Sequence, residues 1–198
     1  MDILKLNAIS PLADKILSGY DLVDESASPA GILVRSANMA EYDLPSSVLA
    51  VARAGAGVNN IPHADYAKRG VVVFNTPGAN ANAVKEMVIC EFMLAARNLA
   101  EGIKWASSLT GDDVAKQVEK GKKQFVGHEI AGKTLAVLGL GAIGRKVAAA
   151  ANALGMIVKG YDPYLSDAAK AEIPFVEVCP TAEEAYEDAN FVSLHMPA

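Results

Sequence analysis

The sequence predicts an α/β protein built on parallel sheets, and three observations support this fold class. Short runs rich in Val, Ile and Leu alternate with segments of helical pattern, as in parallel strands joined by helices. The residues are 52% hydrophobic and 21% charged, which is typical of a folded globular chain. The length of 198 residues suffices for one large domain or two small ones with a sizeable core.

Eight apolar runs are expected to be strands. They are residues 4–9, 31–35, 49–52, 71–75, 134–138, 157–161, 175–178 and 191–195. The longest helical pattern runs from about Asn80 to about Ser107, with Asn80 or Asn82 as its N-cap. The polar segment 110–133 after it is expected to be a surface excursion between two structural units.

Thr181 followed by Glu184 is a capping-box pattern, which predicts a short helix over residues 182–188. This helix would lie just before the last strand. The pattern therefore places a helix crossover between the last two predicted strands.

Charge and cysteine usage exclude several function classes. The net charge is −5 with no block of Lys or Arg, so no nucleic-acid or membrane partner is expected. The densest basic patch, residues 119–124, is interpreted as a solvated surface loop. Cys90 and Cys179 lack a CxxC or CxxH partner, so no metal site is expected. No signal peptide or membrane-spanning run is seen, and a cytoplasmic location is expected.

The stretch from Val137 to Tyr164 carries the strongest functional signal. A GLGAIG run follows a predicted strand and opens an alanine-rich helix, and Asp162 ends the next strand about 20 residues later, as in a dinucleotide fingerprint. Gly139 permits the tight turn, Gly141 lets the backbone approach a pyrophosphate, and Gly144 lets the helix pack closely. Free N–H groups at the helix N-terminus would hold the two phosphates.

Asp162 predicts which dinucleotide is bound. Its carboxylate would accept hydrogen bonds from the adenosine ribose hydroxyls, and its charge would repel the 2′-phosphate of NADP. NAD is therefore the expected cofactor. The alternative interpretation is a structural glycine turn in which Asp162 caps a helix.

Residues 52–88, ARAGAGVNNIPHADYAKRGVVVFNTPGANANAVKEMV, together with the glycine fingerprint, resemble the D-2-hydroxyacid dehydrogenases, most closely the D-3-phosphoglycerate dehydrogenase subgroup. These enzymes typically show RAGxGxDN, then GIxVxNTPxxN, then AE. The likeness extends from residue 32 to the HMP at residues 195–197. Two departures leave the subgroup open, because Asn59 stands where aspartate is usual and Lys85 precedes Glu86 where alanine is common.

The resemblance implies a domain order and an activity. Residues 1–97 would form a flavodoxin-like substrate-domain portion, and residues 98–198 the first half of a Rossmann doubly wound parallel sheet. The implied reaction is NAD-dependent oxidation of 3-phosphoglycerate to 3-phosphohydroxypyruvate, the first step of serine biosynthesis, by a homodimer or larger homo-oligomer. Two alternatives stay open: a dehydrogenase of another small 2-hydroxy acid, or a non-catalytic NAD-binding short form.

No catalytic residue is assigned, because the arginine, glutamate and histidine of the resembled family are expected beyond the chain end. Arg35 and Arg53 offer bidentate, permanently charged forks for a substrate phosphate, although a surface or capping role is an alternative for each. The glycines near Arg53 would free backbone N–H groups to form an anion-binding concavity. The expected substrate-binding residues are Arg35, Arg53, Ala54, Gly55, Ala56 and Gly57.

The cofactor site combines the fingerprint with positions that the resemblance implies. Thr76 lies where the family runs its chain beside the nicotinamide ribose, although Pro-Gly after a strand is also an ordinary turn. His195 matches the H-x-P of the family and is not its catalytic histidine. The expected cofactor-binding residues are Thr76, Gly139, Leu140, Gly141, Ala142, Ile143, Gly144, Tyr161, Asp162, Pro163, His195, Met196 and Pro197.

Overall fold

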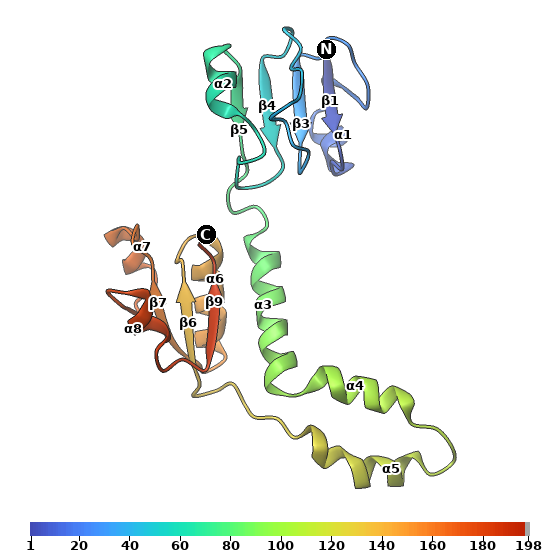
Figure 1. The fold of residues 1–198 in the computed structure, drawn as a ribbon, viewed down its shortest axis with the longest axis vertical. Helices are drawn as coiled ribbons and strands as arrows, with labels where there is room; N and C mark the ends of the chain where they lie inside the picture. The colour runs from blue at the N-terminus through green and yellow to red at the C-terminus, as the bar shows by residue number, and fades with distance from the viewer. Residues whose placement is uncertain (197–198) are drawn as a thin grey trace. The chain divides into compact units, whose positions relative to one another are not determined.

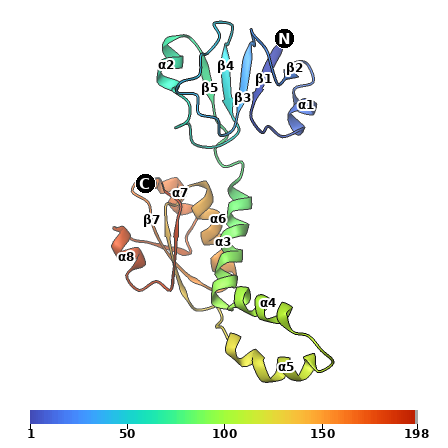
Figure 2. The ribbon, with the colours of Figure 1, turned by 45° about the vertical axis from the view of Figure 1, so that its right-hand side comes forward.

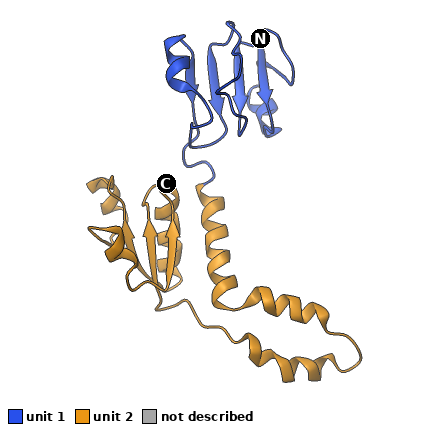
Figure 3. Cartoon of the chain, viewed as in Figure 1, with its two compact units in different colours: residues 1–80 blue, residues 81–198 orange. Residues whose placement is uncertain are grey.

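The computed structural model describes residues 1–196 and divides the chain into two compact units, Met1–Asn80 and Ala81–Ala198 (Figure 3). The boundary lies at the start of helix α3 (Ala81–Ala96), whereas the sequence analysis expected it after that helix, at residue 97. The helix packs with the second unit because Phe92 and Ala96 are buried in that unit's core.

The first unit is built on one parallel sheet with the strand order β2-β1-β3-β4-β5 (Figure 1). Its strands are β1 (Asp2–Leu6), β2 (Asp21–Val23), β3 (Gly31–Val34), β4 (Ala50–Arg53) and β5 (Val72–Phe74), and its helices are α1 (Leu12–Ile16) and α2 (His63–Lys68). Strand β2 was not predicted, because it has three residues and lies at the sheet edge. The other four strands confirm the expected apolar runs within two or three residues.

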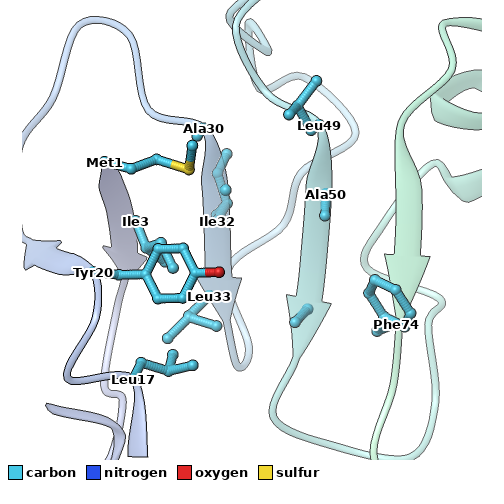
Figure 4. A pocket seen from close by; sticks show the side chains of 12 residues that line it. Met1, Ile3, Leu17, Tyr20, Ala30, Ile32, Leu33, Leu49, Ala50 and Phe74 are labelled. Carbon is cyan, nitrogen blue, oxygen red and sulfur yellow. The ribbon is translucent and has the colours of Figure 1, made fainter.

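One face of this sheet carries the core of the first unit, and the other face is only partly covered. Leu4, Ile32 and Val51 are buried on the core side. On the opposite side, Leu33, Tyr20 and neighbouring side chains line an apolar pocket of about 300 Å³ (Figure 4). The Tyr20 hydroxyl is the one side-chain polar group among the lining residues. This pocket offers no chemistry for catalysis.

The second unit is built on a parallel sheet with the order β8-β7-β6-β9. Its strands are β6 (Thr134–Leu138), β7 (Ile157–Tyr161), β8 (Val176–Val178) and β9 (Phe191–Leu194). Consecutive strands are connected by the helices α6 (Ala142–Ala153), α7 (Asp167–Ala171) and α8 (Ala182–Tyr186). The chain moves outward from β6 to β7 and β8 and then returns to place β9 on the other side of β6. This reversal is the topological switch point of a doubly wound sheet, which confirms the predicted Rossmann half.

Helices α3 and α6 lie side by side over one face of this sheet (Figure 2). Alanines give α6 a flat surface, and Val147, Ala148 and Ala151 are fully buried there. The Phe92 ring of α3 lies against Phe191 of β9 with centroids 5.3 Å apart. The core of the second unit therefore lies between these two helices and the sheet.

The expected single long helix is wrong, because the chain breaks it at Asn98. Asn98 adopts a left-handed conformation with φ of 50°, and α4 (Leu99–Ser108) begins after it in a new direction. The Asn98 side chain donates a hydrogen bond to the carbonyl of Val126 at 3.2 Å. An asparagine tolerates this backbone and ties the break to the returning chain.

Residues 110–133, expected to be a surface excursion between two structural units, belong to the second unit and form a helical hairpin with α4 (Figure 1). It contains α5 (Val114–Gly121) and the 3₁₀ helix η1 (Lys122–Phe125), so the basic patch at 119–124 is helical. The Trp105 ring of α4 lies 5.0 Å from the Phe125 ring. A Cβ at Gly121 would overlap the Trp105 ring, so this glycine lets the hairpin close.

The N-cap of the predicted capping box is confirmed, whereas the Glu184 carboxylate accepts from the Thr181 hydroxyl rather than from its backbone N–H. The Thr181 hydroxyl oxygen accepts a hydrogen bond from the Glu184 N–H at 3.2 Å, and α8 begins at Ala182. The helix ends at Tyr186, two residues before the expected end.

Candidate functional site

Two glycines of the turn between β6 and α6 are required by backbone packing. Gly139 has φ of 93°, and a Cβ there would lie 2.7 Å from the carbonyl carbon of His195. A Cβ at Gly144 would overlap the carbonyl oxygen of Gly139. These contacts bring the start of α6 and the end of β9 against the same turn.

Gly141 differs from these two glycines, because no contact within the described residues requires a glycine at this position. Its φ is −71°, and a Cβ would meet no atom within 4 Å. A glycine with open space beside it is what close approach of a ligand to the backbone requires. Gly141 therefore leaves room for a bound group.

Unpartnered N–H groups surround this open space. Arg145 is the first residue of α6 whose N–H reaches a helical acceptor, the Gly141 carbonyl at 3.1 Å. Within residues 1–196 no acceptor is recorded for the N–H groups of Gly141, Ala142, Ile143 and Gly144. These donors and the positive end of the helix dipole fit the two phosphates of a dinucleotide.

Asp162 joins the end of β7 to the glycine turn. Its Oδ2 accepts a hydrogen bond from Leu140 N–H at 2.8 Å, and its Oδ1 accepts one from Tyr164 N–H at 2.9 Å. The helix-cap alternative is wrong for the helix that follows, because Ser166 caps α7 by accepting from Ala169 N–H. Each carboxylate oxygen keeps lone-pair capacity for a ribose hydroxyl.

Two flanking residues from the expected cofactor set lie on either side of Asp162. Tyr161 is half-buried at the end of β7, and its carbonyl accepts a 2.7 Å hydrogen bond from Gly139 N–H. Pro163 is exposed. The strand end and the glycine turn are thus joined by both main-chain and side-chain bonds.

His195 follows β9 and lies against the same turn. Its Nε2 is 2.8 Å from the hydroxyl oxygen of Ser193, and burial lowers the pKa of its imidazole below the usual range. Ser193 was not among the predicted site residues, although residues two apart on a strand share a face. Met196 is half-buried, and Pro197 lies outside the described residues.

In the first unit, the Arg53 side chain donates to two backbone carbonyls, one in the loop after β3 and one in its own loop after β4. Its Nε donates to the Arg35 carbonyl at 3.1 Å, and its Nη1 donates to the Gly57 carbonyl. A Cβ at Gly55 would lie 3.1 Å from that Nη1. Neither Gly55 nor Gly57 has a positive φ, and both glycines make room for the Arg53 side chain.

Several N–H groups of this loop are already used. Ala54 N–H donates to the Val34 carbonyl at 2.7 Å, and Gly55 N–H donates to the Arg53 carbonyl at 2.9 Å. No acceptor is recorded within residues 1–196 for the N–H groups of Ala56 and Gly57. The donors left for a ligand are therefore fewer than the sequence indicated.

Thr76 and Arg35 lie at the same carboxyl edge of the first sheet. Thr76 N–H donates to the Gly55 carbonyl at 2.9 Å, and the Asn75 amide donates to the Ala56 carbonyl at 2.6 Å. Arg35 is exposed, and its guanidinium has no recorded partner among residues 1–196. Arg53, Ala54 and Thr76 also line a largely apolar cavity of about 390 Å³ beside α1.

Other features of the described residues add no second site. No three His, Cys, Asp or Glu side chains within residues 1–196 lie close enough to share a metal ion. In the same residues, no helix combines the length and apolar character needed to cross a bilayer. Cys90 and Cys179 are free thiols, and burial raises the pKa of Cys179.

Comparison with known proteins agrees with this geometry. Residues 91–198 match the family model described as "D-isomer specific 2-hydroxyacid dehydrogenase, NAD binding domain". The D-3-phosphoglycerate dehydrogenase of Rattus norvegicus is 34% identical over 98% of this chain and 35% of its own length. That of Methanocaldococcus jannaschii is 34% identical over 91% of this chain and 33% of its own length. The chain spans about a third of these relatives.

Solved structures of dehydrogenases are also similar to this chain. NAD⁺-bound 3-phosphoglycerate dehydrogenase of Entamoeba histolytica aligns with a TM-score of 0.72 and 25% identity, over all of this chain and 63% of its own. The holo form of Rhodotorula graminis D-mandelate dehydrogenase aligns with a TM-score of 0.77 and 22% identity, over all of this chain and 66% of its own. The second likeness concerns the fold alone.

Proposed function

Because the chain belongs to the D-isomer specific 2-hydroxyacid dehydrogenases, we propose that it is part of an NAD-dependent oxidoreductase that oxidises 3-phosphoglycerate to 3-phosphohydroxypyruvate, the first step of serine biosynthesis. The observation that carries this proposal is the open, donor-lined turn at Gly141, with Asp162 fixed beside it. The names of the most similar relatives support the choice of substrate. We also propose a cytoplasmic location.

The second unit binds the cofactor in this proposal. The N–H groups of Ala142, Ile143 and Gly144 hold the pyrophosphate, and Gly141 lets it approach the backbone. Asp162 accepts hydrogen bonds from the adenosine ribose and disfavours NADP by charge repulsion. His195 and Met196 border the turn from β9.

The first unit binds the substrate in this proposal. Arg35 offers a free guanidinium for the phosphate, whereas the Arg53 guanidinium group donates to the carbonyls of Arg35 and Gly57. The Ala56 and Gly57 N–H groups serve the carboxylate. Arg53 therefore shapes the loop, and Thr76 holds it through the Gly55 carbonyl.

Bound NAD supplies the acceptor for the hydride that leaves the substrate's carbinol carbon. This chain's residues bind and orient the reactants, and none is assigned as the general base. The His63 Nδ1 faces the Ile61 carbonyl at 3.3 Å, and His195 faces Ser193.

We also propose self-association through the helical hairpin. Ile103 is 61% exposed and Val126 is 72% exposed, so the hairpin presents apolar surface to solvent. Sedimentation velocity is expected to show a dimer or larger species, and Ile103→Lys is expected to weaken it. A monodisperse wild-type monomer at micromolar concentration contradicts this part of the proposal.

The function is tested in two steps. Calorimetric titration of the 198-residue chain is expected to show NAD binding and at least tenfold weaker NADP binding. NADH absorbance is then followed with 3-phosphoglycerate, glycerate and lactate, on this chain and on any longer product of the gene. Turnover of 3-phosphoglycerate by the longer product supports the proposal. Turnover of glycerate or lactate alone would change the proposed substrate to that acid. Absence of NAD binding would contradict the proposed function.

A further inference from the structure

A cavity of the second unit lies between α6 and the segment that joins α7 to β8. Its volume is about 350 Å³. Helix α6 contributes four of its lining residues, which follow the i, i+3, i+4, i+7 spacing of one helix face: Ala142, Arg145, Lys146 and Ala149. The two alanines leave open space on either side of the two long cationic side chains.

The opposite wall of this cavity is apolar. Ile173 is buried, and Phe175 is half-buried and packs against the core of the second unit. Both side chains line the cavity. Because their positions are fixed by the core, they form a firm surface on which the hydrocarbon part of a ligand can pack.

Two opposite charges meet at this cavity although each lies at an unfavourable helix end. Arg145 is the fourth residue of α6, near the positive end of the helix dipole, and Glu172 is the C-cap of α7, near a negative end. The two side chains form an ion pair, with Arg145 Nη1 2.6 Å from Glu172 Oε2. This pair ties α6 to the segment after α7 and holds the guanidinium at the cavity.

The cavity keeps unused donors and a surplus of positive charge. A guanidinium has five N–H groups, and within residues 1–196 the bond to Glu172 is the one recorded for the Arg145 side chain. Lys146 is exposed, and no hydrogen bond or ion pair is recorded for its ammonium group in the same residues. Two cations beside one carboxylate leave one positive charge without a counter-charge. An apolar wall next to a single excess cation is complementary to an organic monoanion.

We propose that this cavity is a binding site for a small monocarboxylate with an apolar body, separate from the proposed cofactor site. The carboxylate accepts hydrogen bonds from the free N–H groups of Arg145 and from the Lys146 ammonium group. The hydrocarbon part packs on Ile173 and Phe175. Among the lining residues, Ala142 alone belongs to the expected cofactor set, and it does so through its backbone N–H rather than its methyl group.

The first experiment compares ligands that differ in charge and in apolar surface. Hexanoate, acetate and hexylammonium are titrated into the ¹⁵N-labelled 198-residue chain, and the amide shifts of residues 142–149 and 172–176 are followed by NMR. Hexanoate is expected to bind with a Kd of about 1 mM. Acetate lacks the apolar body and hexylammonium carries the opposite charge, so each is expected to bind at least about tenfold more weakly.

The second experiment fills the cavity. Ala149→Leu places a larger side chain in it and keeps a residue of high helix propensity, so hexanoate affinity is expected to fall at least about tenfold while NAD affinity stays unchanged. Ala153→Leu is the matched control, because Ala153 is an exposed alanine of α6 that does not line the cavity. It should keep the wild-type affinity. Lys146→Gln is expected to weaken hexanoate about 2- to 5-fold.

The outcomes decide whether this cavity is the site. Hexanoate shifts that are confined to residues 142–149 and 172–176, persist at saturating NAD and disappear in Ala149→Leu support the proposal. Equal hexanoate affinity in the wild type and Ala149→Leu overturns it. Displacement of hexanoate by NAD also overturns it, because the carboxylate would then occupy the phosphate donors of the glycine turn.

Discussion

The Asp162 carboxylate accepts a 2.8 Å hydrogen bond from the Leu140 N–H. The residue that is expected to bind the ribose therefore also holds the glycine turn in place. We predict that Asp162→Ala lowers the free energy of unfolding by about 1–3 kcal/mol, because Leu140 N–H loses a charged acceptor. The same variant should lose discrimination against NADP. Urea unfolding followed by the fluorescence of Trp105, the single tryptophan, reports on the second unit.

Asp162→Asn is the companion variant, since its amide oxygen can keep the Leu140 bond without the charge. It is expected to retain most of the stability and to bind NADP better relative to NAD. Unchanged stability in both variants would show that the Leu140 bond contributes nothing measurable.

Gly141 and Gly144 form a matched pair within the same turn. We predict that Gly144→Ala destabilises the second unit by at least about 2 kcal/mol, because the added methyl overlaps the Gly139 carbonyl oxygen. Gly141→Ala should change stability by less than about 0.5 kcal/mol, since its Cβ meets open space at a negative φ. NAD affinity should nevertheless fall in Gly141→Ala. Equal stability losses in the two variants argue that packing, not ligand approach, explains Gly141.

We predict that replacing Arg53 lowers the stability of the first unit and that replacing Arg35 does not. Arg53→Ala should lower the stability of the first unit by about 1–3 kcal/mol, because the Arg35 and Gly57 carbonyls lose their donor. Arg35→Ala should leave stability unchanged. Hydrogen exchange of peptides from residues 50–60, measured by mass spectrometry, detects the loss. Faster exchange in Arg35→Ala than in Arg53→Ala contradicts this assignment.

Most of the fold could be predicted from the sequence, because its parallel strands are short apolar runs punctuated by glycine and proline. What could not be predicted depends on single residues. Strand β2 is held by pairing with β1 and has little apolar signal of its own. The helix break depends on Asn98, which helical periodicity tolerates but which here adopts a left-handed conformation to reach Val126.

The geometry of the glycine turn follows from local sequence, whereas the side-chain contacts of Arg53 depend on tertiary structure. Spacing identified the glycine turn and Asp162, since both follow from chain connectivity between adjacent strands. The role of Arg53 depends on where its side chain folds, because one of its carbonyl acceptors lies in the loop after β3 and the other in its own loop. The Ser193 partner of His195 could have been predicted from their spacing of two residues, whereas the burial that lowers the pKa of His195 depends on the fold.

His195 predicts a pH dependence of stability. Burial lowers its pKa below the ordinary 6.5, so between the folded-state value and about 6.5 the unfolded chain binds more protons than the folded one. Stability should therefore rise with pH through this window and fall as the solution is acidified below about pH 6.5. The urea midpoint of the wild type should decrease between about pH 7.5 and pH 5.5, and that of His195→Gln should decrease less. His128→Gln is the control, since that side chain is exposed and has no recorded hydrogen bond in the described part of the chain, and it should keep the wild-type slope. A wild-type slope in His195→Gln would mean that the Ser193 contact holds the imidazole equally well in both protonation states.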